Sequence, residues 1–506
     1  VIDEWAKDPE KLALIWVNSM GDERRLTFAD VSRLTNRFAN LLASKGIVKG
    51  DRVIVMLPRI PEWQIAMIGC HKLGAVPIPC VTMLTEKDID YRVRHSGATA
   101  AITTAENTGK FGDAFKACIS VGASNGWTEF NEGLEAACEG FAPVRTEAEE
   151  PAVLYYTSGS SGMPKGVSHS CRSLFAWRVS AWYWLSLAEP DVMWCTADTG
   201  WSKAGTSILY GPWSCGSTVL FYDGPFEPEK RFELLERYGV SVFCAAATEL
   251  RQLVLLDTKG HNLSALRLTV SAGESVNPEI VRSWLDLTGS LLLDGYGQTE
   301  TLMTVLNYPS MPVKPGSMGR PLPGTFAAVL DQHDRVAPTG MTGRLAIRCP
   351  NPQIMLGYWQ DDERTKQCFL EVDGATWFIT GDTASMDQDG YLFYDGRDDD
   401  VINSSGYRIG PMEVENALME HRAVLECAAA ASPDPDRGEV VKAFVILNSG
   451  YVGDEAMIAE LQAHTKRLTA PYKYPRKIEF VYDLPKTVTG KIQRRVLKQR
   501  EFEGDK

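Results

Sequence analysis

The stretch AVLYYTSGSSGMPKG, residues 152–166, joins a short apolar run to a loop of hydroxyl and glycine residues that ends in a lysine. The apolar run, 152–156, has the length and composition of a buried strand. Glycines in the loop let backbone N–H groups close around phosphate oxygens without Cβ clashes, and the hydroxyls add further donors. The stretch therefore predicts a strand that runs into a phosphate-binding loop, in which Lys165 supplies a positive charge.

Two other interpretations of this loop are less favoured. The GxxxxGK[ST] spacing of a Walker loop is absent, and no helical pattern begins directly after the lysine. A flexible Ser/Gly linker would rarely follow a buried strand and carry one fixed lysine. We therefore expect this segment to bind phosphate through Thr157, Ser158, Gly159, Ser160, Ser161, Gly162 and Lys165.

Outside the loop, helical and strand patterns alternate. Thr27 and Asp30 form a capping box at the start of a helical pattern that Gly46 ends. An apolar strand pattern at 52–57 is followed by a helical pattern at 62–73. Because such alternation is typical of parallel strands with helical crossovers, we predict an α/β fold with a large N-terminal region of several subdomains.

The sequence changes character at Gly396-Arg397-Asp398-Asp399-Asp400, where three carboxylates in a row predict an exposed connector. Beyond it, a new set of patterns begins, with helices expected at 412–420 and 454–468 and strands at 440–447 and 477–481. We therefore predict a large domain at 1–397, a hinge at 398–400 and a small α+β domain at 401–506.

Composition and charge exclude some classes of protein. The 506 residues are 44% apolar and 23% charged, as in ordinary globular proteins, and no apolar run approaches the roughly 20 residues of a membrane helix. The net charge of −13 disfavours nucleic acid or an anionic membrane as the main partner. Residues 466–506 nevertheless carry twelve Lys/Arg against five Asp/Glu. They are either a solvated basic tail or a small domain that meets a polyanionic small molecule.

The eleven cysteines lie singly, without a CxxC pair or a histidine cluster. This pattern disfavours a zinc site and a disulfide framework, and it favours a reducing compartment. We expect the cytoplasm, or the mitochondrial matrix if a leader precedes Val1.

The segment TSGSSGMPKG resembles the phosphate-loop signature of the adenylate-forming superfamily, which contains acyl-CoA synthetases, luciferases and peptide-synthetase adenylation domains. A second segment, Asp294-Gly295-Tyr296-Gly297-Gln298-Thr299-Glu300, resembles its second nucleotide motif. We expect a glycine-loosened turn there, after a strand at 290–293. The Tyr296 ring can stack on a purine, the Thr299 hydroxyl can contact the α-phosphate, and Glu300 can hold Mg²⁺.

Three further segments resemble motifs of the superfamily and stand in the expected order. Ser271-Ala272-Gly273-Glu274 resembles the lining of the adenine pocket, which gives Gly273 and Glu274 that role. Thr380-Gly381-Asp382 resembles the ribose-binding motif, in which Asp382 accepts from sugar hydroxyls and Arg397 joins it. PKTVTGKI, residues 485–492, resembles the catalytic-lysine motif. A lysine about 4 Å from the reacting phosphate contributes on the order of 4 kcal/mol, and Lys491 is that residue here.

The resemblance implies a reaction in two halves. Carboxylate and ATP first give acyl-AMP and pyrophosphate, and the thiol of coenzyme A (CoA) then takes the acyl group. In the superfamily a small, mobile domain rotates between the halves about a hinge that here is Asp399. The turn Ser405-Gly406-Tyr407-Arg408 resembles the CoA-facing turn, and Arg437 and Lys466 are candidates for CoA's nucleotide end.

The acid is expected to bind behind the adenylate, beside Trp201, Lys203, Gly205 and Thr299. Trp201 forms a wall of this pocket or is ordinary core, and Lys203 lies near the pocket or points to solvent. Asp198 does not match the aspartate of the amino-acid-activating relatives, which disfavours amino acids. Resemblance along the chain is strongest to the medium-chain acyl-CoA synthetase (butyrate–CoA ligase) branch, which implies a short- or medium-chain, branched or aromatic acid.

Two alternatives stay open at this point. The chain could adenylate an acid for another acceptor, such as a carrier-protein thiol, or it could be a non-catalytic acyl- or nucleotide-binding relative. The presence of the candidate catalytic residues Lys165, Glu300 and Lys491 favours an enzyme. Its expected partners are a small carboxylic acid, ATP, Mg²⁺ and CoA, and a homo-oligomer is possible.

Overall fold

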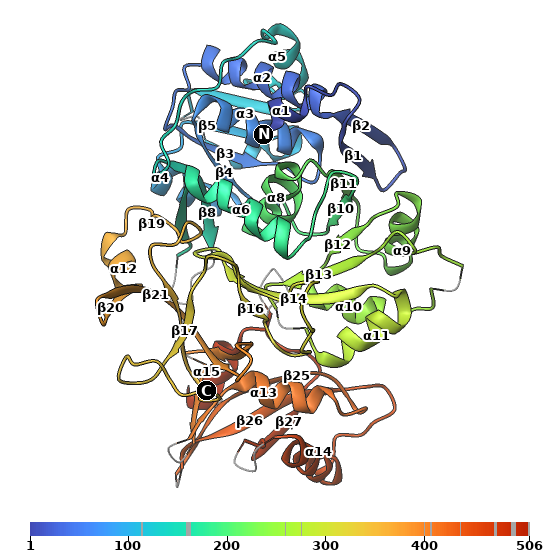
Figure 1. Ribbon diagram of the computed structural model, residues 1–506, viewed down its shortest axis with the longest axis vertical. Helices are drawn as coiled ribbons and strands as arrows, with labels where there is room; N and C mark the ends of the chain where they lie inside the picture. The colour runs from blue at the N-terminus through green and yellow to red at the C-terminus, as the bar shows by residue number, and fades with distance from the viewer. Residues whose placement is uncertain are drawn as a thin grey trace.

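The computed structural model in Figure 1 describes residues 1–112, 115–157, 163–258, 260–274, 276–398, 400–404, 407–435, 437–469, 473–486 and 492–503. An N-terminal sheet lies at one end of the molecule, a C-terminal sheet lies at the other, and three sheets lie between them (Figure 1).

The N-terminal sheet is parallel, as the alternating patterns predict. Its strand order is β4-β3-β5-β6-β7. The helix predicted at the capping box is α2, in which the Thr27 hydroxyl accepts from the Asp30 backbone and the Asp30 carboxylate accepts from the Thr27 backbone. The elements of this region are β3 (Arg52–Met56), β4 (Val76–Pro79), β5 (Ala100–Thr104), β6 (Ala117–Val121), β7 (Thr128–Glu129), α2 (Phe28–Ser44), α3 (Pro61–Leu73), α4 (Glu86–Ser96), η1 (Ala105–Lys110) and α5 (Phe130–Ala136).

A nine-stranded sheet forms the middle of the molecule, in the order β16-β15-β14-β13-β12-β10-β11-β1-β2. The strands from β14 to β1 are parallel, and antiparallel strands close both edges. Its strands are β1 (Leu12–Asn18), β2 (Glu23–Thr27), β10 (Val192–Cys195), β11 (Thr218–Asp223), β12 (Val242–Cys244), β13 (Leu268–Ala272), β14 (Leu291–Gln298), β15 (Leu302–Leu306) and β16 (Arg320–Pro321). The helices of this part are α1 (Ile2–Trp5), α6 (Cys171–Tyr183), α7 (Ser202–Ala204), the π-helical η2 (Gly205–Leu209), α8 (Tyr210–Ser214), α9 (Pro228–Arg237), α10 (Ala247–Leu253) and α11 (Pro278–Thr288).

Two smaller antiparallel sheets flank this one. The first pairs β19 (Gly357–Tyr358) with β9 (Lys165–Ser170) and β9 with β8 (Pro151–Thr157), and α12 (Asp362–Gln367) follows β19. The second has the order β17-β18-β21-β20, with β22 on β21. Its strands are β17 (Ala327–Leu330), β18 (Gly343–Arg348), β20 (Phe369–Val372), β21 (Ala375–Met386) and β22 (Leu392–Arg397).

A separate sheet begins at Ile402, in the order β24-β23-β26-β25, with β27 on β26. Its elements are β23 (Ile402–Ser404), β24 (Tyr407–Ile409), α13 (Pro411–Met419), β25 (Val424–Asp434), β26 (Gly438–Leu447), α14 (Glu455–Leu468), β27 (Lys477–Phe480) and α15 (Arg494–Glu503). The helices and strands predicted beyond the acidic connector lie within two residues of these bounds. The domain limits 1–397 and 401–506 stay predictions, and Asp399 lies outside the described residues.

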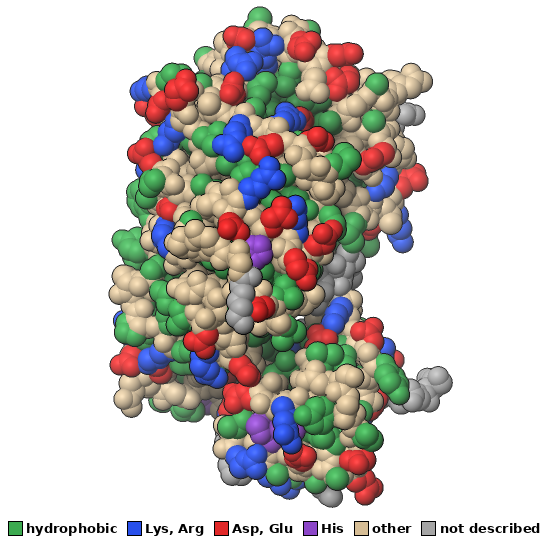
Figure 2. Space-filling view, turned by 90° about the vertical axis from the view of Figure 1, so that its right-hand side faces the viewer, with side chains coloured by type: hydrophobic (Ala, Val, Ile, Leu, Met, Phe, Trp, Pro, Cys, Tyr) green, Lys and Arg blue, Asp and Glu red, His purple; other side chains and the backbone are tan. Residues whose placement is uncertain are grey.

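The apolar cores follow the same division. The largest cluster runs from α2 and α3 to β14 and β15, so the N-terminal and nine-stranded sheets share one core. Phe28 of α2, for example, packs edge-on against Trp213 of α8 with ring centroids 6.1 Å apart. The C-terminal sheet has its own cluster under α13 and α14. Figure 2 shows an indentation between the lobe of the C-terminal sheet and the larger part of the molecule.

Within the described residues, the lobe touches the larger part through α13 and β25. Arg251 of α10 approaches Glu426 of β25 to 4.0 Å, and Gly396 lies against Pro411 so closely that a Cβ would stand 3.0 Å from its ring. Within the described ranges, no helix is both long and apolar enough to cross a bilayer.

Candidate active site

Several predicted site residues lie outside the part of the chain that the structure describes, and for them the predictions stand as made. These residues are Ser158, Gly159, Ser160, Ser161, Gly162, Asp399, Ser405, Gly406 and Lys491. Tyr407 and Arg408 are described as backbone in β24, where they pair with Ser404 and Asn403.

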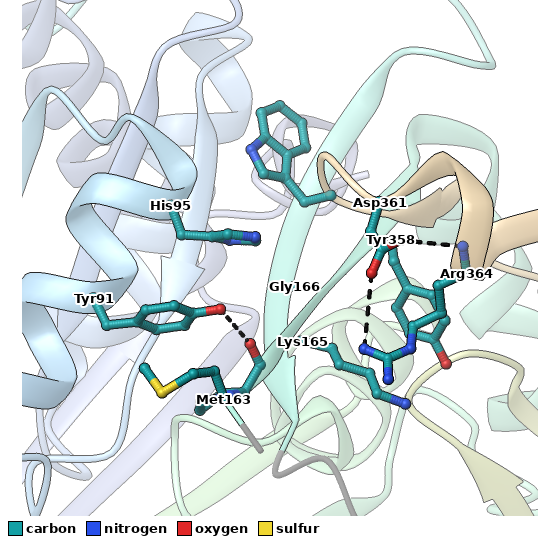
Figure 3. A pocket seen from close by; sticks show the side chains of 10 residues that line it. Tyr91, His95, Met163, Lys165, Gly166, Tyr358, Asp361 and Arg364 are labelled. Atoms are coloured by element: carbon teal, nitrogen blue, oxygen red, sulfur yellow. Dashed lines mark hydrogen bonds and ion pairs between the residues drawn. The ribbon is translucent and has the colours of Figure 1, made fainter. Parts of the chain in front are cut away.

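The two ends of the predicted phosphate loop are held together by the β8–β9 hairpin. Thr157 and Lys165 are cross-strand partners. The Lys165 ammonium lies 5.0 Å from the centre of the Tyr358 ring (Figure 3). Partial burial, together with the neighbouring Arg364 guanidinium, lowers the pKa of Lys165, and Glu300 opposes this shift.

The second nucleotide motif is strand as far as Gln298 and turns only at Thr299 and Glu300, which corrects the turn expected directly after 290–293. β14 continues through Asp294, Gly295, Tyr296 and Gly297 to Gln298. The glycines allow close packing instead of a turn. A Cβ on Gly297 would stand 1.9 Å from the Leu302 carbonyl oxygen, and one on Gly295 would stand 2.9 Å from the Trp184 ring.

The predicted adenine segment lies next to this motif. β13 and β14 are parallel neighbours, and Ala272 pairs with Gly295, so Gly273 and Glu274 leave the sheet beside the nucleotide motif. Gly273 has a φ of +93°, which favours glycine. The two motifs, which follow one another in the sequence, are therefore also neighbours in the sheet.

Asp382 is the meeting point of three strands. Its Oδ2 accepts from the Tyr296 hydroxyl at 2.5 Å and from the Gln298 amide at 2.5 Å, and its Oδ1 lies 3.4 Å from Arg397. Burial raises the pKa of Asp382, while Arg397, Tyr296 and Gln298 act to lower it. The predicted stacking of Tyr296 on a purine stays a prediction, and the structure gives its hydroxyl a second role in orienting Asp382.

Glu300 lies next to Tyr358 of β19 and close to Lys165 of the phosphate hairpin. The Tyr358 hydroxyl donates to its Oε1 at 2.9 Å. Among the described residues, no group of three or more His, Cys, Asp or Glu side chains could hold a metal ion. One half-buried carboxylate, oriented by a tyrosine, fits Mg²⁺ when phosphate oxygens and water complete its coordination.

Thr299 joins the nucleotide motif to the predicted acyl segment. Its hydroxyl lies 3.3 Å from that of Ser202, and its carbonyl oxygen lies 2.5 Å from Nε2 of His169. A carbonyl only accepts, so Nε2 of His169 carries a proton. Burial lowers the pKa of His169 to about 4, so the ring is neutral at pH 7.

The predicted acyl segment forms α7 and the π-helical turn η2, a feature often found at functional sites. Trp201 is half-buried at its start. A Cβ on Gly205 would stand 2.9 Å from the Tyr155 hydroxyl and 3.1 Å from the Tyr210 ring. The Tyr210 hydroxyl lies 2.7 Å from Nε2 of His71. Tyr155 and Tyr210 therefore pack against Gly205, and His71 holds the Tyr210 hydroxyl.

Lys203, which was expected near the pocket or in solvent, is half-buried and turned inward. Its ammonium donates to the Ala272 carbonyl at 3.2 Å, under the predicted adenine segment. Burial alone would lower the pKa of Lys203, but Cys244, Cys195 and Glu249, among other neighbours, raise it on balance. Lys203 is thus charged at neutral pH and ties the acyl segment to β13.

The predicted CoA contacts lie on the C-terminal sheet and its helix. Arg437 follows β25 in a turn where its backbone donates to Asp434 at 3.0 Å, and Lys466 on α14 places its ammonium 3.9 Å from the centre of the Tyr474 ring. Both positions are compatible with a basic surface, and their contact with CoA stays a prediction.

Sequence reasoning missed Tyr358, His169 and Arg364. Tyr358 reaches Glu300 because β19 pairs with β9, nearly 200 residues earlier in the chain. No local pattern signals such a long-range pairing. The proximity of Lys165, Glu300, Asp382 and Arg397, which act on one another electrostatically, is what the ordered motifs predict.

Comparisons with known proteins agree with this geometry. Residues 2–359 match the AMP-binding enzyme family, and residues 413–491 match the AMP-binding enzyme C-terminal domain. Human mitochondrial acyl-coenzyme A synthetase ACSM3 is 40% identical, and the match covers 99% of this chain and 89% of that protein.

Two solved structures are also similar. A Brucella canis acyl-CoA synthetase is 35% identical with a TM-score of 0.74, covering 98% of this chain and 92% of that chain. The anthranilate CoA ligase AuaEII, solved with anthranoyl-AMP, is 30% identical with a TM-score of 0.88, covering 99% of this chain and 96% of that chain.

Proposed function

Because the chain belongs to the family of AMP-binding enzymes, we propose that it acts as an AMP-forming acyl-coenzyme A synthetase. The observation that carries this proposal is the convergence of Lys165, Glu300 and the Asp382–Arg397 pair from three distant segments on one site. Each of these side chains suits a part of ATP: cations for phosphates, and a carboxylate for sugar hydroxyls.

In the first half-reaction, a carboxylate oxygen attacks the α-phosphorus of ATP. The new acyl–O–P bond forms as the bond between the α-phosphorus and the bridging oxygen breaks, and pyrophosphate leaves with the electron pair. Asp382, held by Tyr296 and Gln298, accepts from the ribose hydroxyls. Lys165 and Lys491 offset the repulsion between two anions that must meet.

Mg²⁺ is the metal that this site suits, through the Glu300 carboxylate that Tyr358 orients. When bound, the ion neutralises phosphate charge and favours departure of pyrophosphate. Thr299, next to Glu300, directs its hydroxyl toward Ser202 and so lies where nucleotide and acid would meet.

In the second half-reaction, the CoA thiol attacks the acyl carbonyl and AMP leaves. Residues 401–506 rotate about a hinge at Asp399. CoA then enters along the turn 405–408, and Arg437 and Lys466 contact its nucleotide end. The separate core of the C-terminal sheet supports a domain that can rotate as a unit.

We expect the carboxylic acid substrate to be small or branched. Tyr155 and Tyr210, the latter held by His71, pack against Gly205, which favours short, branched or aromatic acids over long chains. The similar ligase with anthranoyl-AMP acts on an aromatic acid. Since one methylene in an apolar pocket changes discrimination by only about 1–3 kcal/mol, we expect several acids to react.

We propose that the protein works in a reducing compartment. The mitochondrial matrix is favoured because the human relative is mitochondrial. All eleven cysteines are free thiols in the structure, and five of them are buried in the large core region or its sheets: Cys70, Cys80, Cys195, Cys215 and Cys244.

A panel of carboxylic acids tests the function. ATP–pyrophosphate exchange measures adenylation, and AMP release with and without CoA measures transfer. Glu300→Gln should reduce exchange by about two orders of magnitude, whereas Glu229→Gln on the exposed face of α9 should not. Absence of exchange with every acid would contradict the enzyme assignment, and exchange without CoA-dependent AMP release would indicate another acceptor.

A further inference from the structure

We propose that Arg251 of α10 is a positioning residue for adenylation: it holds Glu426 of the lobe, and through Glu426 the base of the predicted catalytic-lysine loop, in the orientation that this half-reaction needs. The inference rests on the proposed function. It adds a contact between the two parts of the chain that adenylation requires and transfer to CoA does not.

Glu426 of β25 meets a cation from each part of the chain. Its Oε2 lies 2.8 Å from the Lys486 ammonium, which belongs to the lobe, and its Oε1 lies 4.0 Å from the Arg251 guanidinium, which belongs to the larger part. The Glu426 side chain is only 16% exposed, so salt screens these interactions less than those of a fully exposed pair. Glu426 therefore connects Lys486 to α10.

The charge of Arg251 also acts on the interior of the lobe. Burial raises the pKa of the Cys427 thiol, next to Glu426 in β25, and Glu415 adds to this rise, while Arg494 and Arg251 oppose it. Figure 1 shows α10 at the end of the nine-stranded sheet that lies nearest to the lobe. The approach of α10 to β25 is thus felt beyond the single ion pair.

Lys486 stands at the base of the loop that carries Lys491. The backbone of Lys486 pairs with that of Ile492, and Gln493 donates from its backbone to the Pro485 carbonyl at 2.8 Å and from its side chain to the Lys486 carbonyl at 2.9 Å. Because Lys491 is bonded to Ile492, fixing this base restricts where Lys491 can lie.

The chain beyond the loop is fixed within the lobe. Arg494, the first residue of α15, donates to the two carboxylate oxygens of Glu415 on α13 at 2.7 and 2.5 Å. Oε1 of Glu415 also accepts from the Ala429 backbone of β25 at 2.8 Å. Since both ends of the loop belong to the lobe, the place of Lys491 relative to the ATP site depends on how the lobe sits on the larger part.

α10 lies at the edge of the nine-stranded sheet where the substrates are expected. It begins at Ala247, three residues after β12 ends, and parallel α/β sheets bind ligands at the carboxyl ends of their strands. Glu249, two residues before Arg251, accepts from the Thr196 hydroxyl at 2.5 Å, in the connection between β10 and the predicted acyl segment. Arg251 therefore holds the lobe on the side where Lys491 has to meet the α-phosphate.

Rotation of the lobe affects the two ion pairs of Glu426 differently. Lys486 and Glu426 turn together, so their pair persists, whereas Arg251 stays on the larger part and loses Glu426. Arg251 thus stabilises one orientation of the lobe and not the other. A partly exposed pair at 4.0 Å is weak, which suits a contact that breaks in every catalytic cycle.

The two half-reactions, measured separately on the full chain, test the role of Arg251. ATP–pyrophosphate exchange reports adenylation, and CoA-dependent consumption of added acyl-AMP reports transfer. Arg251→Ala should lower exchange about two- to fivefold, and Arg251→Glu about tenfold because repulsion from Glu426 replaces attraction. Arg251→Lys should restore most of the exchange. In all three variants, transfer should stay within about twofold of the wild type.

Arg237→Ala is the matched control, because Arg237 on α9 makes a similar ion pair, 3.8 Å from Glu23, within the larger part. Equal losses of exchange and transfer in Arg251→Glu would overturn the inference, since they indicate a structural role alone. Exchange in Arg251→Glu equal to that in Arg237→Ala would overturn it as well.

A distance measurement without substrates tests the contact apart from activity. Spin labels carried by noncanonical residues in place of the exposed Glu229 on α9 and Glu455 on α14 report the separation of the two parts by pulsed EPR. Arg251→Glu should at least halve the share of the main wild-type distance, and Arg237→Ala should preserve it. An unchanged distribution in Arg251→Glu would overturn the inference.

The proposed function and this inference can fail separately. A distribution that depends on Arg251 in a chain that activates no acid would contradict the function and leave the contact between the parts intact. Normal exchange and an unchanged distribution in Arg251→Glu would contradict the role of Arg251 and leave the function intact.

Discussion

The hydroxyl of Tyr296 donates a hydrogen bond of 2.5 Å to the carboxylate of Asp382, and this bond connects β14 to β21 across 86 residues of sequence. It orients the carboxylate that the proposal assigns to ribose. It also offsets part of the burial that raises the pKa of Asp382.

Tyr296→Phe should therefore impair ATP binding in a pH-dependent way. Without the donor, the pKa of Asp382 rises further, so the acidic limb of the kcat/KM profile for ATP moves to higher pH. Loss of one hydrogen bond to a charged group should raise the KM for ATP about five- to tenfold at pH 7.5. Tyr391→Phe, which loses a 2.6 Å hydrogen bond to Pro312, is the control. An unshifted acidic limb in Tyr296→Phe would contradict the role of this bond.

The order of the motifs predicted that Asp382, Arg397 and the nucleotide motif lie together, but it did not predict Tyr358 beside Glu300. Asp382 and Arg397 are cross-strand partners in β21 and β22, and the nucleotide motif lies beside them. What no motif revealed is how they are connected. Gln298 and Tyr296 appeared as nucleotide contacts, and their bonds to Asp382 depend on the packing of two different sheets.

The fold was predictable where periodicity is local, as in α2 and the N-terminal parallel sheet. The fold was not predictable where the close approach of other residues to the backbone determines the local structure. Gly295 and Gly297 suggested a turn, but they are strand residues because Trp184 and Leu302 come too close for a side chain. Likewise, the sequence left the orientation of Lys203 open, since its partner Ala272 lies 69 residues away.

Tyr358→Phe should raise the Mg²⁺ requirement. The change removes the donor to Glu300 and keeps the ring beside Lys165. Loss of a partner that orients a ligating carboxylate typically costs 10–100-fold in metal affinity, and we expect about tenfold here. Pyrophosphate exchange at graded Mg²⁺ measures it. Tyr238→Phe is a matched control that loses a comparable hydroxyl bond to Glu23, and an identical Mg²⁺ response in both variants would refute the assignment.

Gly205→Ala should narrow the range of acids. The added methyl would stand 2.9 Å from the Tyr155 hydroxyl, which must shift within a packed region. We expect a loss of about 1–3 kcal/mol in the free energy of unfolding and a greater fall in kcat/KM for the bulkier acids than for the smaller ones. Thermal unfolding and the acid panel measure these effects.

Gly109→Ala serves as the control for this change because a Cβ at Gly109 meets nothing within 4 Å. A uniform fall in kcat/KM across all acids in Gly205→Ala would place Gly205 away from the acyl pocket and indicate a structural role alone.

Asp294 should make stability depend on pH. Burial raises the pKa of Asp294 to about 7, although the Val276 and Gly295 amides and Lys203 act to lower it. Its pKa is therefore higher in the folded than in the unfolded chain, so its contribution to stability is fully present below about pH 4 and is lost as pH rises through 7. As the pH is raised from 5 to 8, the unfolding temperature of the wild type should decrease more than that of Asp294→Asn.

The exposed Asp286 on α11 provides the control for that comparison. Asp286→Asn should keep the pH dependence of the wild type. If Asp294→Asn keeps it as well, the carboxyl group of Asp294 is ionised in the folded protein throughout this range.

Asp399→Pro should separate the two half-reactions. Proline fixes φ near −65°, which restricts rotation at a hinge, whereas Asp399→Ala preserves rotation and serves as the control. We expect pyrophosphate exchange within about twofold of the wild type and CoA-dependent AMP release reduced more than tenfold, because only transfer requires the second domain orientation. The two rates come from the same protein preparation, so misfolding lowers both together. An equal loss in both half-reactions, or an equal effect of the alanine variant, would show that residues 401–506 do not turn at Asp399.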